Sequence, residues 1–281
     1  MTSFASHVCY CLRSNIFSAA AVFGVLVLAA LSVLGPLLTP YDAYSSLDSA
    51  VMLPPSWAHP CGTDQVGRDV LSRIMMACRL DMAIALSAVL LSLVSGTIVG
   101  SLAGYYGGFL DGLVSRLVDT IMAFPLFVLA MAIVASLGNS VVNIVFATAV
   151  INLPFYIRVA RAETAVRRQS QFVEAALISG NTGMQVIVRH ILPNIMPTIM
   201  VQASLNLGWA ILNAAGLSFI GLGVRPPDAE WGIMVAEGAQ YIVSGEWWIA
   251  LFPGIALMLT VLCFNFLGDA LRDILDPRRR S

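Results

Sequence analysis

Charged residues are scarce in this chain of 281 residues: they make up 11% of it, against roughly 25% in an ordinary soluble domain. Hydrophobic residues account for 58%, and the mean hydropathy is +0.84. A bilayer holds no water to hydrate charges, so this depletion predicts an integral membrane protein. Lysine is absent and the formal net charge is −1, which gives no indication of nucleic-acid binding.

Residues that carry chemistry are also few. The three histidines, His7, His59 and His190, fall in separate loops, and none pairs with a cysteine or carboxylate at metal-ligand spacing. The chain has no Gly-x-x-x-x-Gly-Lys loop to cradle phosphates. We therefore expect no catalytic site, no metal site and no cofactor in this chain, and an energy source on another polypeptide. Cys61 and Cys78 fall in one predicted external loop, but sequence alone does not place their Cα atoms within bridging reach.

Six apolar segments predict transmembrane helices, since about 20 residues cross the hydrocarbon core. The first, residues 16–38, exceeds the apolar part of a signal peptide, which is about 7–15 residues long. The second, residues 82–105, carries Gly96, Gly100 and Gly104 on one face, which favours close packing against another helix. The others are expected at residues 117–137 with a kink at Pro125, 141–157, 195–220 and 249–267, and a short interfacial helix is expected around 232–243.

A polar island over residues 161–194 separates two apolar segments. Ser170 is expected to cap a helix over 171–179 with its hydroxyl. Gly180-Asn181 is a typical helix stop, since both residues tolerate the left-handed conformation. The spacing also predicts one apolar face on this helix, formed by Val173, Ala176, Leu177 and Gly180.

A second short helix is expected to follow directly. Thr182 and Gln185 have the spacing of a capping box, and Pro193 is expected to end the helix. Glu174 lies near the positive end of the first helix, where a carboxylate is favoured. The island therefore predicts a compact helix-turn-helix outside the bilayer, of the kind that a partner protein grips.

Several motifs resemble one family. Glu174-Ala175-Ala176, then Gly180, then His190-Ile191-Leu192-Pro193 resembles the coupling loop of ABC-importer permeases. The segment Gly62-Thr63-Asp64 through Ser72-Arg73 (GTDxxGRDxxSR) is similar to a signature of the C-type subunit of dipeptide/oligopeptide/nickel permeases. Further matches lie at Ser218 to Gly223, Glu230-Trp231-Gly232, Phe264-Asn265, Gly268-Asp269, Leu271 to Asp273 and Asp276-Pro277.

The resemblance implies an all-α integral membrane protein with six transmembrane helices in the type I ABC-importer (MetI-like) fold. It implies that residues 161–194 form a coupling loop that docks on a cytoplasmic ATPase. By resemblance, the coupling residues are Glu174, Ala175, Ala176, Gly180, His190 and Pro193. The partners implied are a homologous B-type permease, two cytoplasmic ATPase subunits that bind ATP, a periplasmic solute-binding protein and the surrounding membrane lipid.

Arginine placement predicts the orientation. With six spans, both termini and residues 161–194 lie on one side, and positive residues gather on the cytoplasmic side. That side would hold Arg13, Arg116, Arg158, Arg161, Arg167, Arg168, Arg189, Arg272 and Arg278 to Arg280, whereas the opposite side would hold Arg68, Arg73, Arg79 and Arg225 among nine carboxylates. The prediction is a multi-pass protein of the bacterial inner membrane with both termini in the cytoplasm.

The chain is accordingly divided into five parts. These are residues 1–15 as a cytoplasmic lead, 16–38 as the first span, 39–81 as a periplasmic loop, 82–270 as the permease core with the coupling loop at 161–194, and 271–281 as a cytoplasmic tail. The periplasmic loop admits two interpretations: a solvated loop held by local ion pairs, or an interfacial structure packed on the outer face of the pore. Asp64 is expected to cap a helix within it.

Polar side chains within the spans are candidates for the translocation path. They are Asn152, Asn206, Asn213 and Asn265, although for each of them hydrogen bonding to a neighbouring helix is the competing interpretation. Asp119 is expected at the membrane interface, and no buried carboxylate or histidine is apparent at mid-span, which disfavours a proton-coupled secondary transporter. A nickel-chelate importer and a membrane scaffold without transport are two more hypotheses that the sequence leaves open. The function predicted is the permease subunit of a binding-protein-dependent ABC importer for di- or oligopeptides or a related solute.

Overall fold

A computed structural model describes residues 15–275, so most of the predicted lead over 1–15 and part of the predicted tail over 271–281 lie outside the described residues. Within residues 15–275 the chain is helical, and its only β pairing is one isolated bridge between Thr63 and Asp69. The helices are α2 (Ile16–Leu38), α3 (Val70–Tyr106), α4 (Gly108–Met122), α5 (Leu126–Leu137), α6 (Val141–Arg168), α7 (Gln171–Ile178), α8 (Gly183–Val186), α9 (Leu192–Phe219), α10 (Trp231–Ala239) and α11 (Trp248–Leu275), with a 3₁₀ turn η1 (Asp48–Ala50) and a π-helical turn η2 (Ile187–Ile191).

Among the described residues, five helical segments are long and apolar enough to cross a membrane, or six if α4 and α5 together form one span. The predicted third span over 117–137 is therefore wrong as a single kinked helix, because α4 and α5 meet at 87°. Pro125 stands immediately before α5 with ψ at 116°. A proline has no N–H to continue the helix and pushes the residue before it out of helical geometry, which accounts for the break.

The second span begins earlier than predicted. The structure starts α3 at Val70 rather than at residue 82, because the carboxylate of Asp69 accepts a hydrogen bond of 2.8 Å from the N–H of Ser72. Asp69 is thus the N-cap, and the prediction that Asp64 caps a helix in this loop is wrong. The helix then runs through the full bundle to Tyr106.

The glycine face of α3 is confirmed as a packing surface against α6, its most extensive neighbour. A Cβ at Gly96 would lie 2.6 Å from the Cβ of Tyr156, and a Cβ at Gly100 would lie 2.5 Å from the carbonyl oxygen of Ile157. A Cβ at Gly104 would clash with the carbonyl oxygen of Arg161. Because each position admits only a hydrogen atom, the two backbones approach closely along three turns.

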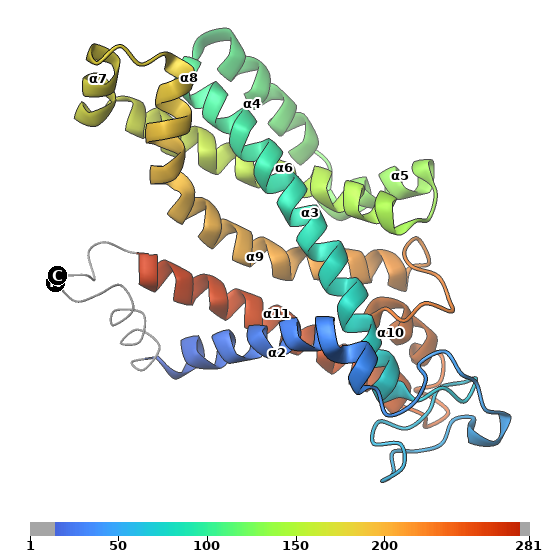
Figure 1. Ribbon diagram of the computed structural model, residues 1–281. Coiled ribbons are helices and arrows are strands. Elements are labelled where there is room, and N and C mark those ends of the chain that lie inside the picture. Colours follow the sequence, from blue (N-terminus) through green and yellow to red (C-terminus); the bar gives the residue numbers. More distant parts are fainter. Residues whose placement is uncertain (1–14, 276–281) are drawn as a thin grey trace.

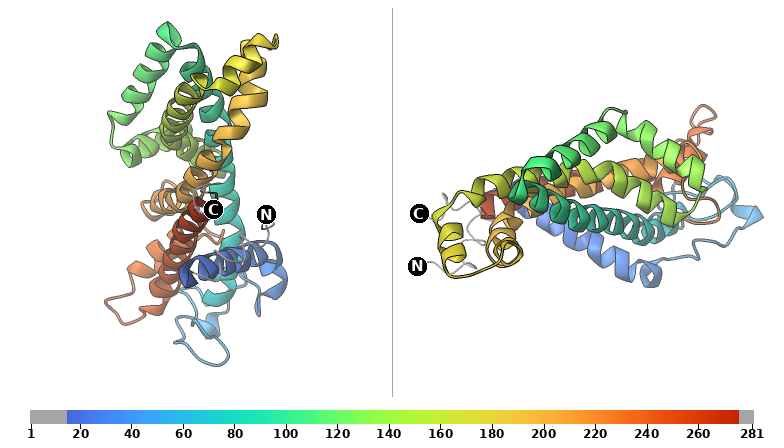
Figure 2. Two further views of the ribbon diagram at one scale, coloured as in Figure 1. Left: turned by 90° about the vertical axis from the view of Figure 1, so that its left-hand side faces the viewer. Right: turned by 90° about the horizontal axis from the view of Figure 1, so that it is seen from above.

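The two ends of the bundle are occupied by different connections (Figure 1). α7 and α8 project at one end, beside the start of α4, and the long loop before α3 lies at the opposite end. α2 packs alongside α11 and α3. The same separation of the two ends is visible when the molecule is turned (Figure 2).

Candidate functional site

The connection between α6 and α9, residues 169–191, folds on local signals. α7 ends in a Schellman arrangement: the N–H of Asn181 donates to the carbonyl of Ala176 at 3.1 Å, and the N–H of Gly180 donates to that of Leu177 at 3.0 Å. Gly180 has a φ of 86° and open space around it, so backbone conformation rather than packing demands glycine. The predicted helix stop at Gly180 is confirmed.

The start of α7 differs from the prediction. The hydroxyl of Ser170 makes no cap and instead donates a hydrogen bond of 2.5 Å to the carbonyl of Arg167, at the end of α6. Ser170 therefore closes the preceding helix, and its predicted side-chain cap on α7 is wrong.

The second short helix keeps the predicted capping box. The N–H of Thr182 donates to Oε1 of Gln185 at 2.8 Å, and the N–H of Gln185 donates to Oγ1 of Thr182 at 3.4 Å. The expected stop at Pro193 is wrong, however, because helix continues through the π turn η2 into α9. Pro193 sits in the first turn of α9, where its missing N–H costs little, and the wider π turn precedes it.

The faces of α7 divide into a buried side and an exposed side. Val173 and Ala176 are buried in a cluster that also holds Val186, Ile187 and Ile191. Leu177, predicted on the same apolar face as Val173 and Ala176, is 46% exposed, and Ile178 is 88% exposed. Phe172 and Met184 are also exposed, and we name the four exposed apolar residues of this connection the tip: Phe172, Leu177, Ile178 and Met184.

The predicted coupling residues do not share one environment. Glu174, Ala175 and Gly180 are exposed beside the tip, and Pro193 is exposed on the first turn of α9. His190 is half-buried in η2. Ala176 is only 6% exposed, so within this chain it packs into the cluster beneath α7 rather than facing outward. Sequence reasoning missed Phe172 and Ile178, whose signal was two large apolar side chains in an otherwise polar island.

Arginine side chains at this end are held by local contacts. Arg167 pairs with Glu163 at 2.7 Å, one turn earlier on α6. The guanidinium of Arg168 lies 5.5 Å from the centre of the Tyr105 ring, at the end of α3. These contacts fix the end of α6 from which α7 projects.

The four asparagines predicted for the translocation path lie on three helices: Asn152 on α6, Asn206 and Asn213 on α9, and Asn265 on α11. Asn152 donates to the carbonyl of Thr148 at 2.9 Å, and Asn213 donates to that of Trp209 at 2.8 Å, each one turn back on its own helix. Asn206 accepts from Gln202 at 3.0 Å, and all three are buried. Asn265 is half-buried on α11. These three hydrogen bonds lie within the asparagines' own helices, so they support neither a place on the translocation path nor the expected bonds to a neighbouring helix.

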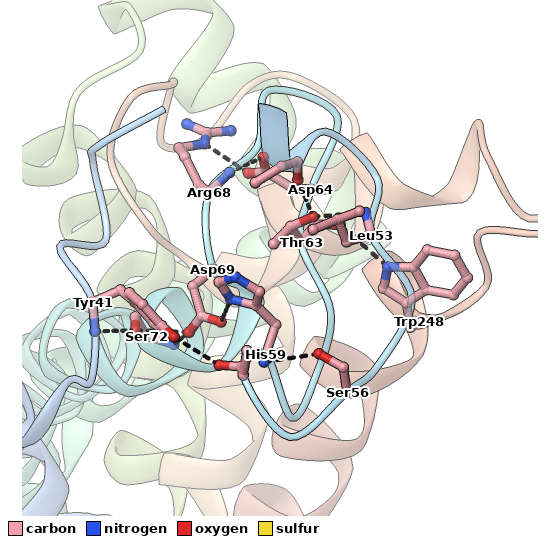
Figure 3. Close-up of polar contacts among 12 residues, drawn as sticks. Tyr41, Leu53, Ser56, His59, Thr63, Asp64, Arg68, Asp69, Ser72 and Trp248 are labelled. Carbon is pink, nitrogen blue, oxygen red and sulfur yellow. Dashed lines mark hydrogen bonds and ion pairs between the residues drawn. The ribbon is translucent and has the colours of Figure 1, made fainter. Parts of the chain in front are cut away.

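The opposite end of the bundle carries a polar network in the loop before α3 (Figure 3). Asp64 accepts from the backbone N–H of Arg68 at 2.9 Å and from its Nε at 2.6 Å. Arg73 lies 3.7 Å from the same carboxylate, and Arg68 also lies 3.6 Å from Glu237 of α10. Asp64, Arg68 and Arg73 are at most 5% exposed. Local ion pairs hold the loop, as one of the two interpretations expected, and the charged residues that form them are buried although most of residues 51–60 are exposed.

The same loop is joined to the helices by further contacts (Figure 3). His59 lies 2.9 Å from Asp69. Trp248, at the start of α11, donates from Nε1 to the carbonyl of Thr63 at 3.1 Å. Cys61 and Cys78 are both free, so the pairing left open by the sequence is absent here. Burial and the carboxylate of Asp69 raise the pKa of the Cys61 thiol above its usual value.

Two buried carboxyl groups tie α3 to α10. Asp81 accepts from the N–H of Trp231 at 3.1 Å, and Glu230 caps α10 by accepting from the N–H groups of Gly232 at 2.9 Å and Ile233 at 2.8 Å. Burial raises the pKa of Glu230. The sequence placed Asp81 among external charges, and nothing local to either residue indicates that they meet across 150 positions.

Comparison with known proteins bears on this arrangement. The family model described as binding-protein-dependent transport system inner membrane component matches residues 96–281. The chain is 40% identical over 258 residues to a probable D,D-dipeptide transport system permease protein of Escherichia coli K12, with 92% of this chain and 86% of the relative covered. It is 39% identical to a di/tripeptide transport system permease protein of Pseudomonas aeruginosa, with 92% of this chain and 86% of the relative covered. It is 41% identical to a glutathione transport system permease protein of Pectobacterium atrosepticum, with 96% of this chain and 89% of the relative covered.

Proposed function

The chain belongs to the family of inner membrane components of binding-protein-dependent transport systems, and we propose that it carries short peptides or a closely related small solute. It is the permease subunit of an ABC importer and not an enzyme. A permease of this family works with an ATPase, a solute-binding protein and a second permease. The hypothesis of a proton-coupled transporter has no support from this membership.

The proposal of a peptide solute is supported by three relatives, whose names specify D,D-dipeptides, di- and tripeptides, and glutathione. All three are about 40% identical over more than nine-tenths of this chain. These solutes share free charged ends on a short peptide backbone. A nickel chelate is not favoured by any contact among the described residues.

The proposed coupling loop is supported by one observation above all: an apolar tip exposed on a connection that is otherwise fully folded. Ile178 is 88% exposed although α7 buries Val173 and Ala176 beneath it. α7 lies between the candidate spans Val141–Arg168 and Gly183–Phe219 and belongs to neither, so lipid is not the expected cover for Ile178. A hydrophobic surface rimmed by polar residues is typical of a protein interface. We infer that the tip, with Glu174 and Ala175, docks on the ATPase.

In the proposed mechanism both termini and α7 face the cytoplasm. ATP binding closes two ATPase subunits and draws the coupling loops of this permease and a homologous partner together. The rigid connection from α6 through α7 and η2 to α9 transmits that motion to the spans. The cavity between the permeases then turns outward to meet a loaded binding protein.

The test is ATP-dependent uptake in proteoliposomes that hold both permeases and both ATPases. With loaded binding protein outside, we expect uptake of a labelled dipeptide or tripeptide that requires internal ATP. Glu174→Arg should abolish this uptake and weaken ATPase association, whereas Asp228→Arg, the same change on an exposed residue at the opposite end, should not. A binding protein that calorimetry shows to prefer a non-peptide solute would contradict the peptide assignment. Unchanged uptake by Glu174→Arg would contradict the coupling role.

A further inference from the structure

Helix α4 carries two contrasting faces. Asp111, Ser115 and Asp119 recur at intervals of four and so line one side of the helix. Leu113 and Leu117 lie on another side and are about half exposed, at 48% and 57%. The apolar side suits lipid, and the polar side needs another environment.

The polar side of α4 faces two arginines on α6. Arg158 donates from one guanidinium nitrogen to Asp119 at 2.9 Å, and Arg161 binds Asp111 through both Nε and a second nitrogen, the latter at 3.0 Å. Both ion pairs are partly exposed to solvent. The side chains of Arg158 and Asp119 are 50% and 69% exposed, and those of Arg161 and Asp111 are 39% and 29% exposed.

A groove of about 380 Å³ opens between the two helices. Its lining includes Ser115 and Asp119 from α4 and Arg158, Arg161 and Ala162 from α6. Small-molecule sites occupy roughly 300–1,000 Å³, so the groove has room for a short peptide. Val114 and Val118 are buried behind it with Ala103 and Ile157, which fixes its floor.

The position of the groove restricts what it faces. Arg161 packs its backbone against Gly104, close to the end of α3, so the groove lies toward the end of the bundle that carries α7 and α8. Charged side chains on membrane-spanning helices are costly against lipid and face a bundle interior or a water-filled cavity. The side chain of Asp119 is 69% exposed on α4, so its carboxylate needs an aqueous or polar surface rather than lipid.

We propose that this groove between α4 and α6 lines the translocation path, and that its two ion pairs receive the charged ends of a zwitterionic peptide. The inference rests on the peptide function proposed above and names residues of this chain that would contact the solute. The peptide carboxylate binds Arg158 or Arg161, and the peptide ammonium binds Asp119 or Asp111.

The geometry suits transient binding. Exposed ion pairs are weak, so they exchange partners readily. Asp111 and Asp119 are eight positions apart on α4, a rise of about 12 Å, and Arg158 and Arg161 are about 4.5 Å apart along α6. A dipeptide extends at most about 7 Å, so both of its ends fit within the groove. The groove lining holds Asp119, Arg158 and Arg161, and Arg161 pairs with Asp111 beside the groove. The two ion pairs together carry no net charge, so a zwitterion is not held there by an excess of either sign.

Water access provides the first test, in an assembled complex whose native cysteines are replaced. Ser115→Cys, on the groove, should react with a charged, membrane-impermeant thiol reagent at least tenfold faster than Leu117→Cys, on the apolar side of the same helix. Saturating transported peptide should slow the Ser115→Cys reaction. Equal rates at the two positions would contradict an aqueous groove.

Solute selectivity provides the second test. Uptake of a free dipeptide and of its C-terminal amide is compared, each presented on binding protein that calorimetry shows to be saturated. The double variant Asp119→Asn with Arg158→Gln should lower the preference for the free peptide at least fivefold. The control Arg116→Gln, on α4 but outside the groove lining, should leave that preference unchanged.

The outcomes separate this inference from the proposed function. If the unmodified complex imports no peptide, both fail together. If it imports peptide and the double variant slows both substrates equally, the ion pairs only fasten α4 to α6 and this inference alone is overturned. A selective loss for the free peptide, with ATPase association intact, supports it.

Discussion

The loop before α3 and the α6–α9 connection lie at opposite ends of the bundle. They differ in which kind of side chain they bury and which they expose. The first buries its charges: Asp64 pairs with Arg68 and lies near Arg73 beneath the surface, and Arg68 joins the group to Glu237 of α10. The second exposes its hydrophobic residues, with Ile178 and Leu177 projecting from a helix whose opposite side is fully packed.

The difference indicates which end is complete within this chain and which end gains free energy when a partner covers it. A buried ion pair is complete within this chain, so the loop before α3 keeps its shape whether or not another protein is bound. An exposed apolar tip leaves free energy to be gained by covering it. Mutations in the first region should therefore act on folding, and mutations in the second should act on assembly.

The largest effect is expected from breaking the buried network. Asp64→Ala leaves Arg68 and Arg73 buried without their shared carboxylate, and loss of one partner of a buried pair costs about 3–5 kcal/mol. Thermal unfolding of the purified complex should show this loss, together with a lower yield in membranes. Asp228→Ala, at an exposed carboxylate, should stay within about 0.5 kcal/mol. Equal stability of the two variants would mean that the loop is not held by these pairs.

The next effect sharpens the contrast, because it should leave folding intact. Ile178→Asp places a carboxylate on the tip and should raise the dissociation constant for the ATPase subunit at least tenfold, or about 1.4 kcal/mol. The matched control is Val243→Asp, since Val243 is 98% exposed and Ile178 is 88% exposed. Quantitative co-purification measures both. If Val243→Asp weakened association as much, the tip would have no special role.

A smaller effect tests the local signals that shape the tip. Thr182→Ala removes the capping box and should destabilise α8 by about 1 kcal/mol, seen as faster hydrogen exchange at the Gln185 amide. Ser170→Ala should affect the start of α7 less, because the Ser170 hydroxyl bonds back to Arg167 instead of capping it. A larger effect of Ser170→Ala than of Thr182→Ala would contradict these cap assignments.

The smallest effect concerns pH at the polar end. Burial raises the pKa of Glu230, so the folded state holds this proton more tightly than the unfolded state, whose glutamate titrates near about 4.3. Protonation of Glu230 therefore stabilises the folded state fully at a pH below the pKa of the unfolded state. This stabilisation is lost as the pH rises through the raised pKa of the folded state.

Glu230→Gln keeps an acceptor for the α10 cap beside Asp81 and removes this titration. The unfolding midpoint of the variant should therefore fall less between pH 4 and pH 8 than that of the parent protein. Asp228→Asn, at an exposed carboxylate, should not change the slope. An unaltered slope in Glu230→Gln would contradict the raised pKa.

The features that the sequence predicted correctly depend on residues close together in the chain. The glycine face of α3, the left-handed Gly180 and the Thr182–Gln185 box each depend on residues within a few turns, and all three are present. Pro125 was recognised as a disruption, but the 87° bend depends on how α4 and α5 pack against α6.

The failures of sequence reasoning have tertiary causes. Pro193 continues a helix because a π turn precedes it, and Ala176 is buried in a cluster that also holds Val186 of α8. Asp81 and Glu230 meet from distant parts of the chain. The groove between α4 and α6 likewise joins residues about 40 positions apart, beyond the reach of any local pattern.

The most direct test of the central claim asks which side of the membrane the exposed face of α7 occupies and what covers it. Ala175→Cys, in a chain whose five cysteines are replaced by serine, presents one exposed thiol beside the tip. An impermeant thiol reagent should label it only from the cytoplasmic side, and bound ATPase subunit should protect it. Labelling from the periplasmic side, or labelling at the same rate with the ATPase bound, would contradict the account.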